Sequence, residues 1–316
     1  MLTVGSLFAG IGGFDLGFER AGMRTAWQVE IDAACRGVLA RHFPQSERFV
    51  DIRDCGAHNL QSVDVICGGF PCQDLSVAGK RAGLSGARSG LFYEMVRIID
   101  ELRPAFLVWE NVPVLLSSDD GRDFARVLVA LAGIGYHGAW RVLNAKYFGV
   151  AQHRRRVFGV FARGDTAAGR AAEILALADG LRGHPAACRE AGTDVAGTAV
   201  DGPDVCGALT TGVARPDDNK AQAGHLVALS PTLRAMNHAE GHANGGGQVA
   251  IAGGDDRGFI VRRLTPLECE RLQGFPDGWT EGQSDAKRYH QLGNAVCVNV
   301  MEWLGRRLVT VCEGAE

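Results

Sequence analysis

The chain has 316 residues, of which 46% are hydrophobic and 22% are charged, a balance typical of a folded globular protein and not of a disordered chain. A formal net charge of −3 excludes a strongly basic nucleic-acid-binding protein, although an average over the chain can hide a basic cleft. No apolar run approaches the ~18 residues of a membrane span, and the N-terminus lacks the pattern of a secretory signal, so we expect a cytoplasmic protein.

Strands that alternate with amphipathic helices are predicted from Leu2 to Phe161. The predicted strands are Leu2–Phe8, Thr25–Glu30, Val63–Cys67, Phe106–Trp109, Trp140–Asn144 and Val157–Phe161. The predicted helices are Gly12–Ala21, Ala33–His42, Leu91–Leu102 and Phe124–Ala132. This alternation predicts an α/β fold with a mostly parallel sheet that helices cover on both faces.

The composition changes over residues 165–260, which contain no tryptophan and carry seven Lys and Arg against twelve Asp and Glu. Within them only a short helix over Ala171–Leu181 is predicted. Regular structure returns with predicted helices over Thr265–Leu272, where Thr265 caps the helix, and over Asn299–Leu308. The pattern favours one α/β domain built from both ends of the chain, with a small irregular domain inserted between them.

A glycine-rich turn, Phe8–Gly13, follows the first predicted strand and opens the first helix. Glycines at this junction let a ligand approach the backbone closely, and Glu30 at the end of the second strand can accept ribose hydroxyls. Position 15 is Asp, so the spacing departs from the GxGxxG pattern of dinucleotide sites. S-adenosylmethionine, a nucleoside without phosphates, is the obvious candidate, and a plain tight turn is the alternative.

Two further segments follow predicted strands. Cys72 lies in a loop shaped by Gly and Pro after Val63–Cys67, where a thiol is exposed to substrate and is a candidate nucleophile. Glu110 follows Phe106–Trp109, and a carboxylate in a cleft can donate a proton. The alternatives without a catalytic role are a small buried thiol for Cys72 and a helix N-cap or surface acid for Glu110.

The segment Gln152–Arg156 leads into the strand Val157–Phe161. Alternation puts Gln152, Arg154 and Arg156 on one face, where paired arginines suit a phosphate or a base carbonyl, although a solvated charged edge has the same pattern. Tyr289–Val296 is expected to form a Gly-Asn turn before the final helix. Nine scattered cysteines without CxxC spacing predict reduced thiols and no metal site.

Together these segments resemble the DNA cytosine carbon-5 methyltransferase family of bacteria and phages, and the likeness covers nearly the whole chain in the family's order. The segments that carry it are FAGIGG (8–13), Glu30, Asp51 of DIR, GGFPCQ (68–73), SGLFYEMVRII (89–99), ENV (110–112), QHRRR (152–156), RRLTPLECERLQGFP (262–276) and LGNAV (292–296). The resemblance implies a Rossmann-like S-adenosylmethionine-dependent methyltransferase domain with a small irregular target-recognition domain.

The family implies a role for each matched residue. Cys72 corresponds to the nucleophile that adds to carbon 6 of a flipped-out cytosine, and Glu110 to the acid at ring N3. Arg154 and Arg156 match the pair that holds the base and the catalytic loop. The positions that match the surroundings of S-adenosylmethionine are Phe8, Gly10, Gly12, Glu30, Asp51, Leu91 and Asn294.

The same resemblance sets the expected domains and partners. Residues 1–164 form the catalytic and cofactor-binding domain, 165–263 the target-recognition domain, and 264–316 return to the catalytic domain. The partner is double-stranded DNA, with a cognate restriction endonuclease acting on the same DNA, and we expect a monomer. Because 165–260 is acidic, Lys80, Arg81 and Arg88 are candidates for DNA contacts.

Three alternatives stay open at this point. A tRNA cytosine methyltransferase shares the scaffold, but that branch typically has PPCQ where this chain has FPCQ, and a CFT motif that is missing here. A catalytically inactive base-flipping or S-adenosylmethionine-binding module would not need Cys72, Glu110 and both arginines. A nicotinamide-dependent oxidoreductase needs the GxGxxG that this chain lacks.

Overall fold

The computed structural model describes residues 1–71, 90–164, 166–176, 230–231, 250–255 and 258–314. The chain divides into two compact units. The first comprises residues 1–143, 155–176 and 295–316, and the second comprises 144–154 and 177–294. Among the described residues, no helix is long and apolar enough to cross a membrane.

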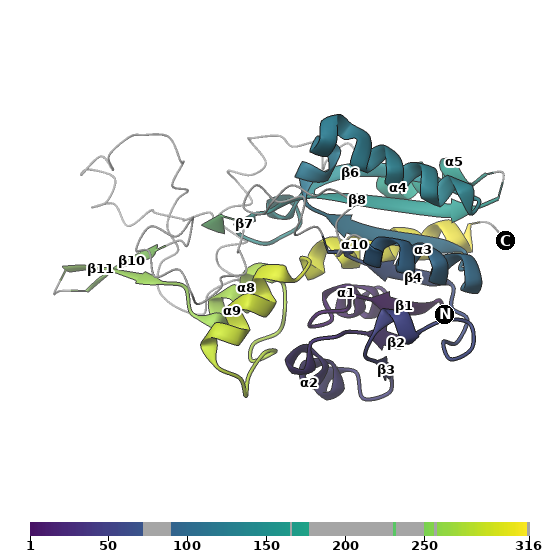
Figure 1. The fold of residues 1–316 in the computed structure, drawn as a ribbon. Helices are drawn as coiled ribbons and strands as arrows, with labels where there is room; N and C mark the ends of the chain where they lie inside the picture. The colour runs from purple at the N-terminus through teal and green to yellow at the C-terminus, as the bar shows by residue number, and fades with distance from the viewer. Residues whose placement is uncertain (72–89, 165, 177–229, 232–249, 256–257, 315–316) are drawn as a thin grey trace. The chain divides into compact units, whose positions relative to one another are not determined.

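A seven-stranded sheet forms the middle of the first unit, with the strand order β3-β2-β1-β4-β5-β8-β6 (Figure 1). Neighbours from β3 to β5 are parallel, and β8 runs antiparallel to β5. The strands are β1 Thr3–Leu7, β2 Arg24–Val29, β3 Glu47–Phe49, β4 Val65–Gly68, β5 Phe106–Asn111, β6 Tyr136–Asn144 and β8 Arg155–Arg163. The order reverses between β1 and β4, which is the mark of a doubly wound, Rossmann-like sheet.

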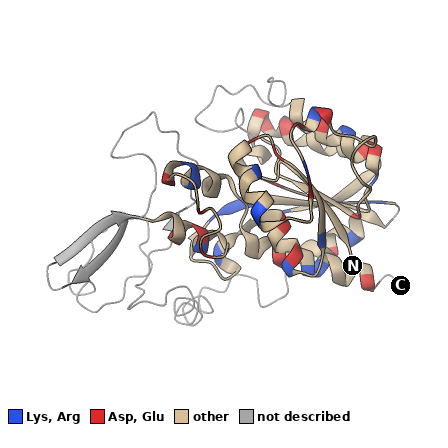
Figure 2. Cartoon of the chain, turned by 90° about the horizontal axis from the view of Figure 1, so that it is seen from below, with Lys and Arg blue, Asp and Glu red and all other residues tan. Residues whose placement is uncertain are grey.

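Helices join these strands. They are α1 Gly13–Arg20, α2 Ala33–His42, α3 Gly90–Leu102, α4 Arg122–Gly133, α5 Ala167–Leu175 and α10 Val298–Glu313, with the short 3-10 turns η1 Ile52–Asp54, η4 Pro113–Leu116 and η5 Ser118–Gly121. α2 begins where it does because the Asp32 side chain accepts the N–H groups of Ala34 and Cys35. Charged residues lie mainly on the helices, and the central strands β1 and β4 carry none (Figure 2).

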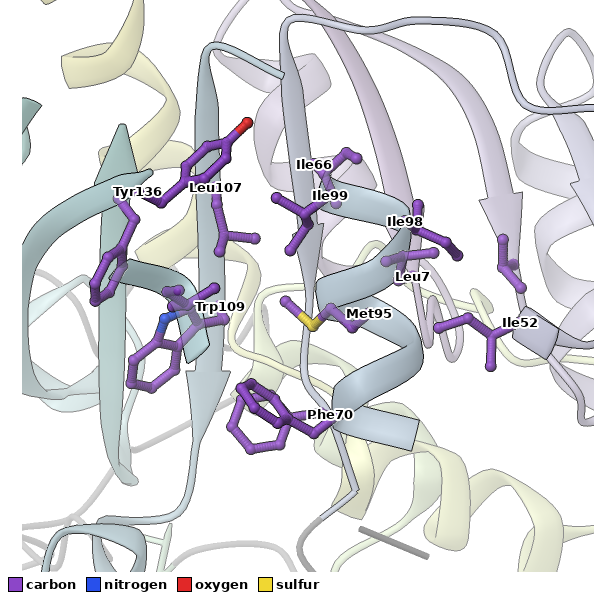
Figure 3. Close-up of a cluster of buried hydrophobic side chains, with 14 of the residues drawn as sticks. Leu7, Ile52, Ile66, Phe70, Met95, Ile98, Ile99, Leu107, Trp109 and Tyr136 are labelled. Atoms are coloured by element: carbon purple, nitrogen blue, oxygen red, sulfur yellow. The ribbon is translucent and has the colours of Figure 1, made fainter. Parts of the chain in front are cut away.

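A large cluster of buried hydrophobic side chains packs α3 and α4 against the sheet, and Figure 3 shows the part of it around α3. Two indoles fill it by covering glycines on the neighbouring strands. Trp27 is the register partner of Gly5, and Trp109 is the register partner of Gly159. A Cβ atom at Gly5 would lie 2.1 Å from Trp27, and one at Gly159 would lie 2.2 Å from Trp109. The glycines therefore make the room that these two fully buried side chains need.

Helices α1 and α10 cross closely because glycines stand at the contact. A Cβ atom at Gly17 would lie 2.3 Å from the Cβ of Met301 and 2.8 Å from backbone atoms of α10. A Cβ atom at Gly305 would lie 2.7 Å from the Cβ of Ala21. This crossing joins the first helix of the chain to the last and makes residues 295–316 part of the first unit.

The second unit has less described structure. Its elements are η6 Ala145–Tyr147, β7 Gln152–His153, β9 Ser230–Pro231, β10 Ala250–Asp255, β11 Gly258–Arg263, α8 Pro266–Gln273 and α9 Asp285–Asn294. β10 and β11 form an antiparallel hairpin, and β7 pairs with β9. α8 begins with a capping box in which Thr265 and Glu268 satisfy each other's N–H groups.

The predicted Rossmann-like α/β fold is confirmed, as are the helix over Ala33–His42 and the cap at Thr265. The helix predicted over Ala171–Leu181 is wrong in its bounds, because α5 ends at Leu175, where Ala176 turns to extended backbone. The turn predicted over Tyr289–Val296 is also wrong, since α9 continues to Asn294.

The division into units does not follow the predicted domain boundaries. α5 belongs to the first unit, and α8 and α9 belong to the second. The target-recognition role of residues 165–263 stays a prediction, because most of this segment lies outside the described residues.

Candidate active site

The carboxyl ends of β1, β2, β4 and β5 meet at one edge of the sheet because these strands are parallel. In open α/β sheets a ligand binds at this edge, where the strand order reverses. Here the reversal lies between β1 and β4. The residues that follow these strands are Phe8, Glu30, Gly69 and, at the end of β5, Glu110.

The turn after β1 has an unusual backbone. Phe8 has φ = 54°, Gly10 has φ = 56° and Gly12 has φ = 85°. Residues other than glycine rarely adopt such positive φ angles. A Cβ atom at Gly12 would lie 2.5 Å from the Phe43 ring, whereas one at Gly10 would meet nothing within 4 Å. The turn thus packs tightly on α2 at Gly12 and leaves open space at Gly10. A strained aromatic residue beside such a space is typical of a ligand site.

Glu30 closes this turn from the end of β2. Its Oε2 accepts the N–H of Gly10 at 2.7 Å, and its Oε1 accepts the N–H of Asp32 at 2.8 Å. Burial raises the pKa of Glu30, while these two N–H groups act in the opposite direction. A largely buried carboxylate with further lone pairs is suited to accept the hydroxyls of a ribose.

The other predicted cofactor residues are placed differently. Asp51 follows β3 at the same edge, caps η1 and holds the Arg53 guanidinium, which lowers the pKa of Asp51 to about 2. Leu91 lies in the first turn of α3 and packs against the hydrophobic core. Asn294 is exposed at the end of α9, in the second unit.

Glu110 and Arg156 form an ion pair in which Nε lies 3.0 Å from Oε1. Both side chains are largely buried, with 12% and 14% of their surface exposed. The antiparallel pairing of β5 with β8 brings them together, since Glu110 is the register partner of Phe158. The guanidinium therefore fixes the direction of a carboxylate that stands at the ligand-binding edge.

The loop after β4 is tied to the same place. The Asn111 side chain donates a hydrogen bond to the carbonyl of Phe70 at 3.2 Å, and a Cβ atom at Gly69 would lie 3.4 Å from Glu110 Oε2. Cys72 follows two residues later in the sequence and lies outside the described residues, as do Lys80, Arg81 and Arg88.

Arg154 and Arg156 do not share one continuous strand. β7 ends at His153 and β8 begins at Arg155, so the chain bends at Arg154, whose N–H bonds the carbonyl of Gln152 at 3.0 Å. Burial still alternates as predicted, with Gln152 and Arg154 buried and His153 and Arg155 exposed. Arg154 donates to the carbonyl of Gly293 at 3.3 Å within the second unit.

The cysteines of the described residues do not resemble nucleophiles. Five of the six are buried and Cys312 is half-buried, and burial raises the pKa of Cys55 to about 11, of Cys269 to about 12, of Cys67 well above the usual value and of Cys312 above it. A thiol that stays protonated at neutral pH is a poor nucleophile. Of the nine cysteines, only Cys72, Cys188 and Cys206 remain.

Asn111 has a role that the sequence analysis did not assign. Its side chain joins the ends of β4 and β5, and its Oδ1 accepts the N–H of Val112. The available signal was an amide residue immediately after Glu110, at the end of an apolar run, because a side-chain amide near a buried strand needs hydrogen-bond partners.

The model of the family described as C-5 cytosine-specific DNA methylase matches residues 2–176 and 217–310. The chain belongs to this family. This methylase is similar to Type II methyltransferase M2.BsuMI of Bacillus subtilis, with 30% identity over 97% of this chain and 75% of that protein. It is 27% identical to Type II methyltransferase M.HhaI of Haemophilus parahaemolyticus, over 94% of this chain and 91% of that protein.

Solved structures share the fold of the methylase. Dnmt2 methyltransferase of S. pombe matches with a TM-score of 0.66 at 17% identity and covers 100% of both chains. A putative DNA modification methyltransferase encoded within an E. coli prophage matches with a TM-score of 0.64 at 21% identity, over 99% of this chain and 100% of that one.

Proposed function

We propose that this methylase transfers a methyl group from S-adenosylmethionine to carbon 5 of a cytosine flipped out of a specific DNA sequence, with Cys72 as the nucleophile. The Glu110–Arg156 pair carries the proposal. The pair lies beside the loop that follows β4. The Asn111 side chain holds this loop through the carbonyl of Phe70, and Phe70 is two residues before Cys72 in the sequence.

The proposed chemistry assigns a task to each side chain. Carbon 5 of cytosine is a weak nucleophile until the Cys72 thiolate adds to carbon 6 and pushes an electron pair toward carbon 5. Glu110 acts as an acid that donates a proton to ring N3 and so offsets the charge that builds on the ring, and Arg156 orients the Glu110 carboxyl group. After the methyl group has bonded to carbon 5, a base removes the proton there. The released electron pair expels the thiolate and restores the ring.

Geometry at the turn after β1 supports S-adenosylmethionine as the cofactor. The space at Gly10 and the carboxylate of Glu30 fit a nucleoside whose ribose hydroxyls donate to Glu30. The bound cofactor supplies an electrophilic methyl group on a sulfonium. Phe8, Gly10, Gly12, Glu30, Asp51, Leu91 and Asn294 are proposed to hold it.

Residues 165–263 are proposed to choose the DNA sequence, with Arg154 holding the base and the catalytic loop. Lys80, Arg81 and Arg88 are proposed to contact the DNA backbone. By analogy with its Type II relatives, we further propose a cognate restriction endonuclease for the same DNA and a monomeric methylase.

Bisulfite sequencing of plasmid DNA from cells that express the protein tests the activity and reports the sequence context. Methylation of tRNA without methylation of duplex DNA would overturn the choice of substrate.

A trapped adduct tests the nucleophile. A duplex with 5-fluorocytosine at the target position has no carbon-5 proton to lose, so the reaction stops with the protein bonded to DNA. We expect a shifted band on a denaturing gel for the wild type and for Cys269→Ser, and none for Cys72→Ser. A shift that survives Cys72→Ser would show that another residue is the nucleophile.

A further inference from the structure

A buried polar cluster lies where α1 packs against the sheet. Ser6 of β1 is the register partner of Gln28 on β2 and of Cys67 on β4. Asp15 lies in the first turn of α1 and contacts these three strand residues at Ser6, whose Oγ donates a hydrogen bond to Asp15 Oδ2 at 3.2 Å. All four side chains are fully buried.

The carboxyl group of Asp15 is only partly satisfied. Its Oδ1 has no hydrogen-bond partner among the described residues. Gln28 lies close enough to lower the pKa of Asp15, although neither polar atom of its amide has hydrogen-bond geometry. A buried carboxyl group with an unused oxygen is costly, and it commonly marks a functional site.

The groups with the largest effect on the pKa of Asp15 include no cation. The groups that face it are Ser6, Gln28 and Cys67 from the strands and the carboxylate of Glu19 from its own helix. On the side of α10, Arg20 lies 4.0 Å from the Glu302 carboxylate. Burial raises the pKa of Asp15 to about 7, while Gln28, the backbone N–H of Asp15 itself and Ser6 oppose that rise, and Glu19 adds to it.

This carboxyl group lies at the start of the helix that follows the turn of Gly10 and Gly12. We propose that Asp15 makes the cofactor site selective for charge, favouring the cationic sulfonium of S-adenosylmethionine over the uncharged thioether of S-adenosylhomocysteine. The inference rests on the proposed function. In a water-poor site a negative charge attracts a nearby cation strongly, and methyl transfer removes that cation, so Asp15 favours exchange of product for fresh cofactor.

The proposal requires that Asp15 lose a proton when the cationic cofactor binds. Near neutral pH part of the free protein carries a proton on Asp15, and a bound cation favours the ionised form. Binding of S-adenosylmethionine therefore releases a fraction of a proton from Asp15 to the buffer, and binding of S-adenosylhomocysteine releases none from this group.

Titration calorimetry of both ligands, in two buffers with different protonation enthalpies and at a pH near the pKa of Asp15, measures this proton. For the wild type we expect more protons released with S-adenosylmethionine than with S-adenosylhomocysteine. Asp15→Asn should reduce that difference and weaken the preference for the cation on the order of tenfold. The matched control is Asp64→Asn, which removes a part-buried carboxylate bonded to Thr3 at the opposite end of β1.

Equal weakening of both ligands by Asp15→Asn would mean that Asp15 is structural and would overturn the proposal. If the variant does not fold, the wild type alone decides, since its preference for S-adenosylmethionine must rise as the pH is raised from 6 toward 7. A flat preference refutes the inference while leaving the proposed function intact. A wild type that binds neither ligand refutes the proposed function, and the inference with it.

Discussion

Replacing Glu30 should weaken cofactor binding far more than it weakens DNA binding. The carboxylate is proposed to accept ribose hydroxyls, and a hydrogen bond to a charged group contributes about 1.5–3 kcal/mol. Allowing for partial replacement by water, Glu30→Ala should cost about 1–3 kcal/mol of binding free energy, which raises the Kd for S-adenosylmethionine by roughly 5-fold to 150-fold.

Two existing contacts of Glu30 refine this expectation. Its oxygens already accept the N–H groups of Gly10 and Asp32, so Glu30→Ala also loosens the turn in the free protein. Glu30→Gln keeps the shape but has one carbonyl oxygen, so one N–H must face an NH₂ group. We expect Glu30→Gln to lie between the wild type and Glu30→Ala in both cofactor affinity and stability.

Isothermal titration with S-adenosylmethionine and, separately, with a target duplex measures the two affinities. Glu101→Ala is a suitable control, because Glu101 also accepts a backbone N–H, that of Ala57 at 2.9 Å, but lies in the last turn of α3, at the opposite end of that helix from Leu91. Losses of equal size for cofactor and for DNA in Glu30→Ala would refute the reasoning and make Glu30 a structural residue.

Three further predictions concern packing, pH and sequence choice. Gly17→Ala should destabilise the protein by about 1–3 kcal/mol in denaturant unfolding, because its Cβ would lie 2.8 Å from backbone atoms of α10, whereas Gly37→Ala, which meets nothing within 4 Å, should not destabilise it. Because burial raises the pKa of Asp15 from 3.8 to about 7, the protonated form stabilises the fold fully below pH 3.8, and this contribution is lost as the pH rises through 7. Thermal unfolding of Asp15→Asn should therefore depend less on pH, and a pH dependence equal to that of the wild type would contradict this. A chimaera with residues 165–263 of a relative should methylate the relative's sequence in bisulfite sequencing, and unchanged specificity would count against the proposed recognition role.

Much of the sheet could be predicted from the sequence because the period and length of its strands are local properties. Val65–Gly68 and Phe106–Asn111 are short apolar runs followed by Gly, Pro or polar residues, and this pattern alone places Glu110 near a ligand-binding edge. Helix α9 was missed because it is mostly polar, and its sequence ends in Gly-Asn, which is typical of a turn.

The partners within the site could not be predicted, since they depend on strand order. Alternation along Gln152–Arg156 predicted two arginines acting as a pair. In the structure Arg156 pairs with Glu110, because β8 runs antiparallel to β5, and Arg154 bonds the carbonyl of Gly293, far away in the sequence. No local pattern specifies which strands become neighbours. The burial of Asp15 likewise depends on three strands and a helix meeting in space.

The close crossing of α1 and α10 has a consequence for biosynthesis. Gly17 and Gly305 meet only when the long intervening chain, including the whole second unit, has already been made. Contacts between such distant residues form late, because closing a long loop costs entropy before the contact stabilises anything. During synthesis on the ribosome, the side of α1 that packs against α10 therefore stays exposed after the N-terminal strands have been made. The first unit of the methylase can complete its fold only after residues 295–316 have emerged.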